Sequence, residues 1–360
     1  MDFTFSAEAD DAAALAATIL SDHTTPERLA EVDATGLRFD PVLWRALGEA
    51  GLLTLTTPEN QGGAGLGLVE LCRVLVEAGR KVAPIPLASD GAARTFLAQH
   101  GRGVPVGSVL SCAIAEEHEY APRVPVTTAT PNGAEYVLSG AKCLVTAATV
   151  ATSFLVPATT PDGVAVFVVD PAAPGLTIHD QRLSDGDVAG LLELDGVRVT
   201  DEQRIGESDG RAAHHLMNLV SVTTSAVQLG IAEGALALTS EYAKTREQFE
   251  RPIGTFQAVS QRLADGYIDT RLQALTLWQA AWRLDQGLPA DDAVATAKLW
   301  AADSGHRLAH TTVHIHGGVG IDMDDLPHRY FTTAKRYEFE QGGATDQARR
   351  LGHLLASGLT

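Results

Sequence analysis

The chain is poor in positive charge. Its 360 residues include 27 lysines and arginines against 45 aspartates and glutamates, giving a formal net charge of −18 and an isoelectric point near 5.0. The basic residues are scattered and form no run. Nucleic acids and anionic membrane surfaces are bound through clustered lysine and arginine, so the composition argues against both as partners.

Cysteine is also scarce. Cys72, Cys112 and Cys143 are odd in number and lack CxxC spacing. This pattern predicts neither a disulfide framework nor a zinc site, and we expect no bound metal. The first residues are acidic and lack the basic-then-apolar order of a signal peptide, and no apolar run approaches ~18 residues. We therefore expect a cytoplasmic protein with reduced thiols and no membrane span.

Apolar residues make up 45% of the chain, enough for a large core, and their spacing changes along it. Residues 1–104 show helical spacing, interrupted by a glycine-rich loop and by two prolines after a helix expected over 67–80. Residues 105–208 contain short β-branched runs separated by turn-forming residues. We expect an N-terminal α-helical domain followed by a middle antiparallel β domain.

Helical spacing returns over residues 209–360. The sequence predicts long helices near residues 211–245, 257–286, 291–316 and 341–357. Short connections between long helices favour an up-and-down four-helix bundle. The expected fold class is therefore α+β, with three domains in the order helical, β, helical.

Two segments of this last part carry chemical information. Arg246-Glu-Gln-Phe249 lies between two predicted helices, and a guanidinium there offers paired donors to diphosphate oxygens. Taken alone, a solvated surface arginine explains this motif more often. His314-Ile-His-Gly-Gly-Val-Gly320 places glycines where a backbone can approach a cofactor closely. A helix C-cap explains such glycines about as well.

Together these two segments resemble the C-terminal domain of acyl-CoA dehydrogenases, as does Leu326-Pro-His-Arg-Tyr-Phe331. Residues 51–66 resemble the N-terminal loop of that family, and the segments at 138–142 and 194–199 resemble its β domain. The resemblance covers nearly the whole chain. It implies the acyl-CoA dehydrogenase fold, with an N-terminal helical domain, a middle β domain and a C-terminal four-helix bundle.

The resemblance also implies FAD as the cofactor. In that family FAD lies between the β domain and the bundle, and a neighbouring subunit holds part of its diphosphate and adenosine. The residues that match the donors of this contact are Arg246, Gln248, Phe249, His314, Gly317 and Gly318. The family usually has glutamine at the position of His314, but an imidazole still donates one hydrogen bond.

The half of the site that faces the flavin ring departs from the family pattern. A Thr-Glu-Pro-x-x-Gly-Ser-Asp loop is replaced by Ala115–Arg123, which lacks its glycine and serine. After Lys142, Leu144 stands in place of a stacking tryptophan, although Thr146 keeps a hydroxyl. Each lost contact is worth about 1 kcal/mol or more, so we expect this chain to hold the ring poorly.

The catalytic base is missing as well. Gln341 stands where many members carry their glutamate, and an amide cannot accept the α-proton of an acyl thioester. Other members place the glutamate at positions matching Val220 and Ser221, where this chain has no carboxylate. Glu340 is adjacent to Gln341, but one step along a helix turns a side chain by about 100°. We therefore expect no catalytic residue in this chain.

These departures resemble the β-type subunit of α2β2 acyl-CoA dehydrogenases of actinobacterial steroid degradation, whose partner subunit carries the glutamate and the complete flavin site. The resemblance implies α,β-desaturation of an acyl-CoA thioester, with a steroid side-chain CoA as the implied substrate. It also implies electron-transfer flavoprotein or a similar protein as acceptor.

Other hypotheses stay open. A self-sufficient homotetramer would use Glu340 as base, and His118 or His316 has the imidazole pKa that suits a base. A non-catalytic scaffold would have lost flavin and substrate altogether. An oxidase or hydroxylase of the same fold is a fourth alternative.

Overall fold

The computed structural model describes residues 4–358, and the chain folds into two compact units. The helical unit is built from the chain up to Glu31, from Leu68–Ala83 and from Thr224 onward. The sheet unit is built from Val32–Gly67 and Pro84–Thr223. The predicted order of helical, β and helical segments is confirmed. The predicted domain boundaries at 104/105 and 208/209 interrupt no helix or strand and stay predictions.

The N-terminal third is helical, as its apolar spacing predicted. Ser6 starts the first helix by accepting a hydrogen bond from the Ala9 N–H at 3.1 Å, and Asp40 starts the third in the same way. Among its described residues the α-helices are α1 (Ala7–His23), α2 (Pro26–Ala34), α3 (Pro41–Glu49), α4 (Leu68–Arg80) and α5 (Leu87–Gln99).

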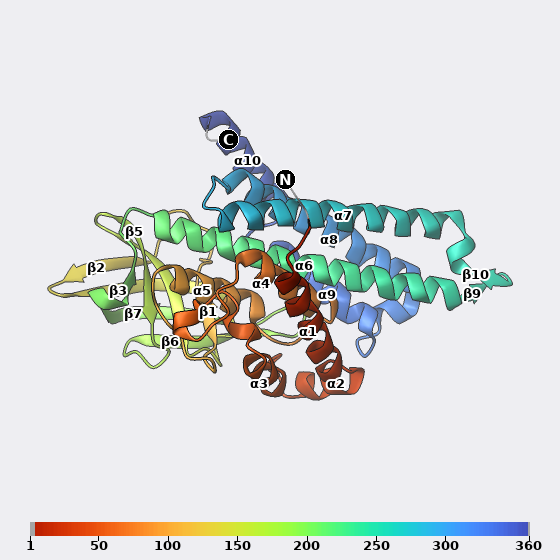
Figure 1. The fold of residues 1–360 in the computed structure, drawn as a ribbon, viewed down its shortest axis with the longest axis horizontal. Helices are drawn as coiled ribbons and strands as arrows, with labels where there is room; N and C mark the ends of the chain where they lie inside the picture. The colour runs from red at the N-terminus through yellow and green to blue at the C-terminus, as the bar shows by residue number, and fades with distance from the viewer. Residues whose placement is uncertain (1–3, 359–360) are drawn as a thin grey trace. The chain divides into compact units, whose positions relative to one another are not determined.

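The C-terminal third contains five helices within its described residues, one more than predicted. The additional one, α9, is the segment that the sequence identified only through its Leu326–Phe331 motif. The helices are α6 (Arg211–Thr245), α7 (Gln257–Asp285), α8 (Asp291–His316), α9 (Leu326–Phe339) and α10 (Ala344–Ser357). Figure 1 shows α7 and α8 running side by side.

The helix predicted to begin at residue 341 begins at Ala344 instead. Gln341 and Gly342 have φ angles of 64° and 90°, outside the helical region, so the chain turns between α9 and α10. Glu340 is the C-cap of α9. The expected rotation of about 100° between the Glu340 and Gln341 side chains was therefore wrong, because neither residue lies within a helix.

The helices α4 and α6 pack with their backbones in contact. A Cβ atom on Gly79 would lie 2.1 Å from the Val227 carbonyl oxygen, and one on Gly230 would lie 2.0 Å from the Val76 carbonyl oxygen. Only glycine fits at either position. The start of α4 is held by a distant residue, since Asp285 accepts hydrogen bonds from the first amides of that helix.

Helix α6 is long and apolar enough, by length and composition, to span a membrane, which the sequence analysis did not anticipate. However, 83% of its most apolar 18-residue window is buried within the protein. A lipid-facing helix would expose that surface instead. The burial of α6 is that of a core helix.

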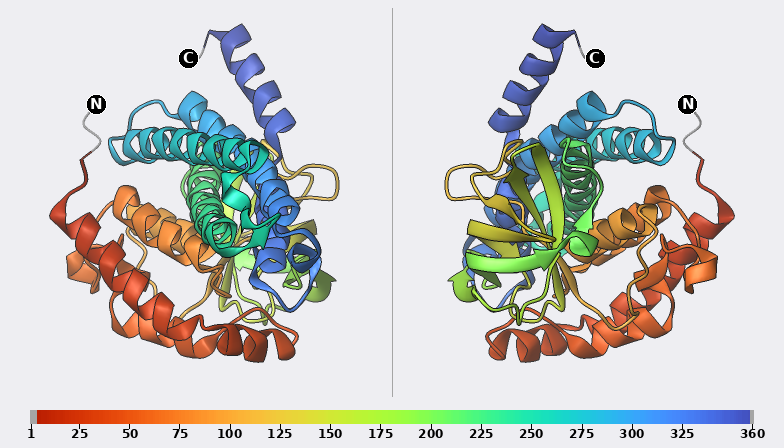
Figure 2. Two further views of the ribbon diagram at one scale, coloured as in Figure 1. Left: turned by 90° about the vertical axis from the view of Figure 1, so that its right-hand side faces the viewer. Right: turned by 90° about the vertical axis from the view of Figure 1, so that its left-hand side faces the viewer.

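The middle third forms one eight-stranded curved sheet (Figure 2). Its order is β6-β7-β3-β2-β4-β5-β8, and β1 also pairs with β4. The predicted antiparallel pairing is confirmed for most neighbouring strands. It was wrong for two pairs, since β1 and β2 run parallel to β4. Neither is joined to β4 by a hairpin, since β3 intervenes in the chain. The strands are β1 (Leu110–Cys112), β2 (Thr128–Asn132), β3 (Glu135–Thr146), β4 (Ser153–Thr160), β5 (Gly163–Val169), β6 (Leu176–Arg182), β7 (Val188–Thr200) and β8 (Arg204–Ile205).

A buried ion pair joins α5 to the sheet. The Asp90 and Arg94 side chains are 0% and 1% exposed, and Arg94 Nε donates to Asp90 Oδ2 at 2.6 Å. Asp90 also accepts the Leu110 N–H at 2.8 Å, and Arg94 donates to the Ser108 carbonyl at 2.5 Å. The pair thereby fastens the segment that enters β1 to α5.

Replacing Asp90 with alanine leaves the Arg94 guanidinium buried without its carboxylate. We expect Asp90→Ala to lower the free energy of unfolding by about 3–5 kcal/mol in denaturant titrations followed by circular dichroism. Glu135→Ala is the control, because Glu135 pairs with Arg198 on the surface at 3.3 Å and such pairs are worth less than about 1 kcal/mol. Equal losses of unfolding free energy in the two variants would contradict a stabilising role for the buried Asp90–Arg94 ion pair.

Candidate cofactor half-site

The predicted arginine motif folds into a hairpin beyond the ends of α6 and α7 (Figure 1). Two-residue strands β9 (Glu247–Gln248) and β10 (Arg251–Pro252) pair in an antiparallel manner. The Ile253 N–H closes the base of the hairpin on the Arg246 carbonyl at 2.8 Å. Arg246 and Gln248 are both exposed. Their side chains are available to another molecule.

The tip of the hairpin is strained. Phe249 and Glu250 have φ angles of 53° and 62°, a left-handed pair of the kind that two-residue hairpins usually build from Asn-Gly. Each such residue costs about 1–2 kcal/mol. The Phe249 side chain is nevertheless 88% exposed and meets Phe256 only edge-on, with ring centroids 6.1 Å apart. Its conformation presents an aromatic ring outward instead of filling the core.

The predicted glycine motif ends α8. Gly317 has φ 66° and ψ −135°, which favours glycine, and its N–H bonds to the Val313 carbonyl. The short helix η5 (Gly317–Ile321) follows. His314, Gly317 and Gly318 are exposed, and a Cβ atom on either glycine would meet nothing within 4 Å. Another molecule can therefore approach this backbone closely.

The structure brings the six predicted cofactor residues to one end of the helical unit. α6 and α8 lie against each other near their C-terminal ends, where Thr239 Oγ1 donates to Thr312 Oγ1 at 3.2 Å. The hairpin follows α6 and the glycine turn follows α8. The donors present (a guanidinium, an amide, an imidazole, open glycine backbone) and an exposed aromatic ring fit the diphosphate and adenosine of FAD.

On the sheet unit, the loop that replaces the flavin loop is held by a residue that the sequence analysis did not single out. Glu116 accepts hydrogen bonds from Lys142 Nζ at 2.8 Å, Thr127 Oγ1 at 2.7 Å and the Val126 N–H at 2.6 Å. Burial raises the pKa of the Glu116 carboxyl, but the bonds from Lys142 and Thr127 outweigh it and leave the pKa lowered. Glu116 and Lys142 thus serve the fold.

The position of the missing tryptophan lies on a bulge of β3. Leu144 has φ 54°, is 40% exposed, and donates its N–H to the Gln181 side chain at 2.7 Å. Leu144 is an aliphatic residue at this position and offers no ring to stack on a flavin.

Two other residues of this region were singled out from the sequence. The Thr146 carbonyl accepts a hydrogen bond from Ser111. His118, an alternative base, is 90% exposed on the preceding loop.

At the position of the catalytic glutamate, Gln341 is 7% exposed. Its carbonyl accepts a hydrogen bond from Gln347 Nε2 at 2.7 Å, whereas its own Oε1 meets no donor among the described residues. Glu340 lies 3.9 Å from Arg336 in an ion pair. Ser221, at the other family position, is buried and donates to the Met217 carbonyl. Both Glu340 and Ser221 thus have a partner within the fold.

A buried lysine supports this turn, and no sequence pattern pointed to it. Lys298 is 0% exposed, and its Nζ donates to the Tyr337 and Glu338 carbonyls at 3.2 and 3.0 Å. It thereby satisfies the last carbonyls of α9. Burial lowers its pKa to about 8, and the negative charges of Glu340 and Glu338 oppose that shift.

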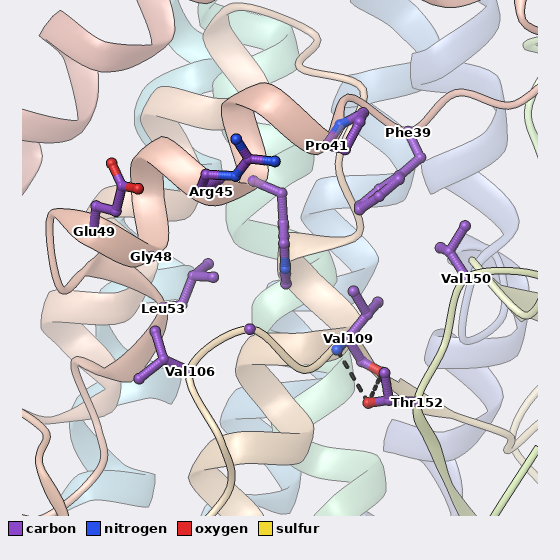
Figure 3. A pocket seen from close by; sticks show the side chains of 12 residues that line it. Phe39, Pro41, Arg45, Gly48, Glu49, Leu53, Val106, Val109, Val150 and Thr152 are labelled. Carbon is purple, nitrogen blue, oxygen red and sulfur yellow. Dashed lines mark hydrogen bonds between the residues drawn. The ribbon is translucent and has the colours of Figure 1, made fainter.

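The sheet unit also contains a cavity of about 370 Å³, lined mostly by apolar side chains. Phe39, Leu53, Val106, Val109 and Val150 surround it (Figure 3). None of the predicted cofactor residues lines it. The cavity is separate from the half-site.

Lys298 makes stability depend on pH. Its pKa is about 8 in the fold against 10.5 in a flexible chain, so between these values the unfolded chain binds more protons. The free energy of unfolding should therefore rise from pH 8 to pH 10.5, by about 3 kcal/mol at most. We expect Lys298→Met to lose this rise and Lys244→Met, at an exposed lysine, to keep it. The same pH dependence in Lys298→Met and wild type would contradict the assignment.

Relieving the hairpin tip should stabilise the fold. We expect the double variant Phe249→Asn, Glu250→Gly to gain about 1 kcal/mol in thermal or denaturant unfolding, because both residues tolerate left-handed backbone. Phe249→Ala keeps the strained backbone and should show no such gain. If the double variant is less stable than wild type, the Phe249 ring stabilises the fold of this chain in the absence of a partner, which would contradict a strained tip.

Profiles of three acyl-CoA dehydrogenase domains match the chain in order. The N-terminal domain matches residues 6–123, the middle domain 112–195 and the C-terminal domain 210–352. The acyl-CoA dehydrogenase FadE27 of Mycobacterium tuberculosis is 44% identical over 375 residues, which cover 99% of both proteins.

Solved structures agree. A chain of the ChsE4-ChsE5 complex from Mycobacterium tuberculosis superposes with a TM-score of 0.93 at 44% identity, covering 99% of each chain. A chain of a Tcur3481-Tcur3483 steroid ACAD variant superposes with a TM-score of 0.91 at 40% identity, covering 98% of each chain. This chain belongs to the acyl-CoA dehydrogenase family, whose cofactor is FAD.

Proposed function

We propose that this chain is the non-catalytic, β-type subunit of a heteromeric FAD-dependent acyl-CoA dehydrogenase. In the proposed α2β2 complex it contributes the half-site for the FAD adenosine and diphosphate. A homologous partner subunit contributes the flavin-ring site and the catalytic glutamate. Both solved relatives described above are named as pairs of different chains, which supports a heteromeric assembly.

One contrast carries this proposal. The cofactor donors on the helical unit are exposed, and the aromatic ring beside them is held outward at a conformational cost. At the position of the base, by contrast, Gln341 is buried and Glu340 is paired with Arg336. An exposed half-site in a chain without a base suits a subunit that completes a site on another chain.

Each residue of the half-site has a role that follows from its chemistry. The Arg246 guanidinium would pair with diphosphate oxygens in a bidentate manner, and the Gln248 amide and His314 imidazole would donate single hydrogen bonds. The Phe249 ring would cover one face of the adenosine, and the Gly317 turn would bring backbone against the diphosphate. FAD, when bound, accepts the β-hydride of the acyl thioester, and the partner's glutamate would take the α-proton.

The proposed substrate is a bulky acyl-CoA such as a steroid side-chain thioester. This substrate class is supported by the name of one solved relative, a steroid ACAD. The acceptor would be electron-transfer flavoprotein or a similar protein, and the complex would work in the cytoplasm.

Co-purification tests the proposal. The chain should be produced alone and together with a candidate catalytic subunit, a member of the same family that carries the glutamate, and flavin absorbance and acyl-CoA turnover should be recorded for both. We expect a colourless chain alone and a complex with one flavin per pair of different subunits. A yellow, active single chain would contradict the proposal, and a complex without flavin would favour a scaffold.

Variants then locate the base. We expect replacement of the partner's catalytic glutamate by glutamine to abolish turnover, a loss of about two to four orders of magnitude or more. Glu340→Gln in this chain is the matched control and should leave turnover unchanged. The reverse result would assign the base to Glu340.

A further inference from the structure

Two side-chain contacts join the ends of the helices that carry the half-site. Thr239 of α6 and Thr312 of α8 are fully buried, and their hydroxyls lie 3.2 Å apart. One turn further along each helix, the rings of Tyr242 and His316 stack with centroids 4.3 Å apart and planes inclined by 25°. The stack is the last of these contacts before the hairpin and the glycine turn.

His316 is fixed in its orientation. Its Nδ1 donates to the Thr312 carbonyl at 2.8 Å, since a carbonyl can only accept, and the residue is 6% exposed. η5 packs directly on it, because a Cβ atom on Gly320 would lie 3.1 Å from the His316 Cβ. The glycine turn that begins with the next residue is therefore packed against the residue that carries the stacked ring.

Tyr242 is coupled to the hairpin in the same way. Its carbonyl accepts the Arg246 N–H at 2.8 Å, in the last turn of α6. The neighbouring Ala243 carbonyl lies 3.0 Å from where a Cβ atom on Gly254 would be, so the returning arm of the hairpin rests on this turn. The hairpin is therefore attached to the helical turn that carries the Tyr242 ring.

We propose that Tyr242 and His316 are positioning residues that hold the hairpin and the glycine turn at the spacing that one FAD adenosine diphosphate requires. This inference rests on the proposed function. The role of His316 is not that of a ligand donor, because its ring is buried and its Nδ1 is engaged by Thr312. The stacking of the two rings instead joins two segments that are about 70 residues apart in sequence and that the ligand must contact together.

Cofactor affinity of the complex with the partner subunit provides the first test. Tyr242→Leu removes the ring, and we expect the Kd for FAD, read from flavin fluorescence, to rise about two- to tenfold. Tyr242→Phe keeps the ring and should bind as wild type does. Tyr267→Leu, at a tyrosine that is 60% exposed on α7, controls for loss of any tyrosine.

A double-mutant cycle tests the pair itself. His316→Ala should raise the Kd by a similar factor, and the double variant Tyr242→Leu, His316→Ala should be little worse than either single variant. Losses that multiply in the double variant would overturn the proposal, because they would show that the two rings act independently.

Amide hydrogen exchange in the full chain without FAD separates this inference from the proposed function. We expect the amides of residues 317–320 to exchange faster in Tyr242→Leu than in wild type, and Tyr242→Phe to match wild type. Unchanged exchange in Tyr242→Leu would overturn the inference even if the complex binds FAD. If the amides of residues 317–320 exchange faster in Tyr242→Leu but the complex binds no FAD, the proposed function is contradicted. The stacked pair would then hold the glycine turn in place without serving a cofactor.

Discussion

Direct backbone packing of α6 is the constraint on which the helical unit depends. Gly79 and Gly230 let α4 and α6 approach without side chains between them, and a Cβ atom at either position would overlap a carbonyl oxygen. A 35-residue helix held in this way has little freedom to slide or rotate. Its C-terminal end therefore delivers Arg246 and the hairpin to a defined place, and α8 brings the glycine turn beside it.

In the proposed complex this chain supplies cofactor contacts and the partner subunit supplies catalysis. Strain is retained where it presents the Phe249 ring outward, as expected for a binding surface that another molecule covers. The segments that would serve the flavin ring and the proton are occupied by structural contacts instead. Glu116 is bonded to Lys142, and Glu340 ends α9 beside Arg336. This distribution is consistent with a subunit whose outward contacts serve a site on another chain.

Sequence pattern predicted the helices and strands well, whereas the site residues stay a prediction. Apolar spacing located helices such as Leu68–Arg80 nearly to the residue, because one face of each is buried. The residues of the half-site were predicted from motifs, because exposed donor residues follow no periodic pattern in the sequence. Lys298 and the Glu116–Lys142 pair were not predictable, because burial of a charge depends on partners distant in the chain. The left-handed Phe249 was equally hidden, because nothing in the motif indicates a strained turn.

The central claim is that this chain holds the adenosine of a flavin whose chemistry takes place on a partner subunit. Photolabelling of the complex with 8-azido-FAD, followed by peptide mass spectrometry, tests it most directly, because the azide reacts with whatever lies beside the adenine. The account predicts label on this chain, within the hairpin of residues 246–253 or the turn of residues 314–321. Label confined to the partner subunit would contradict it.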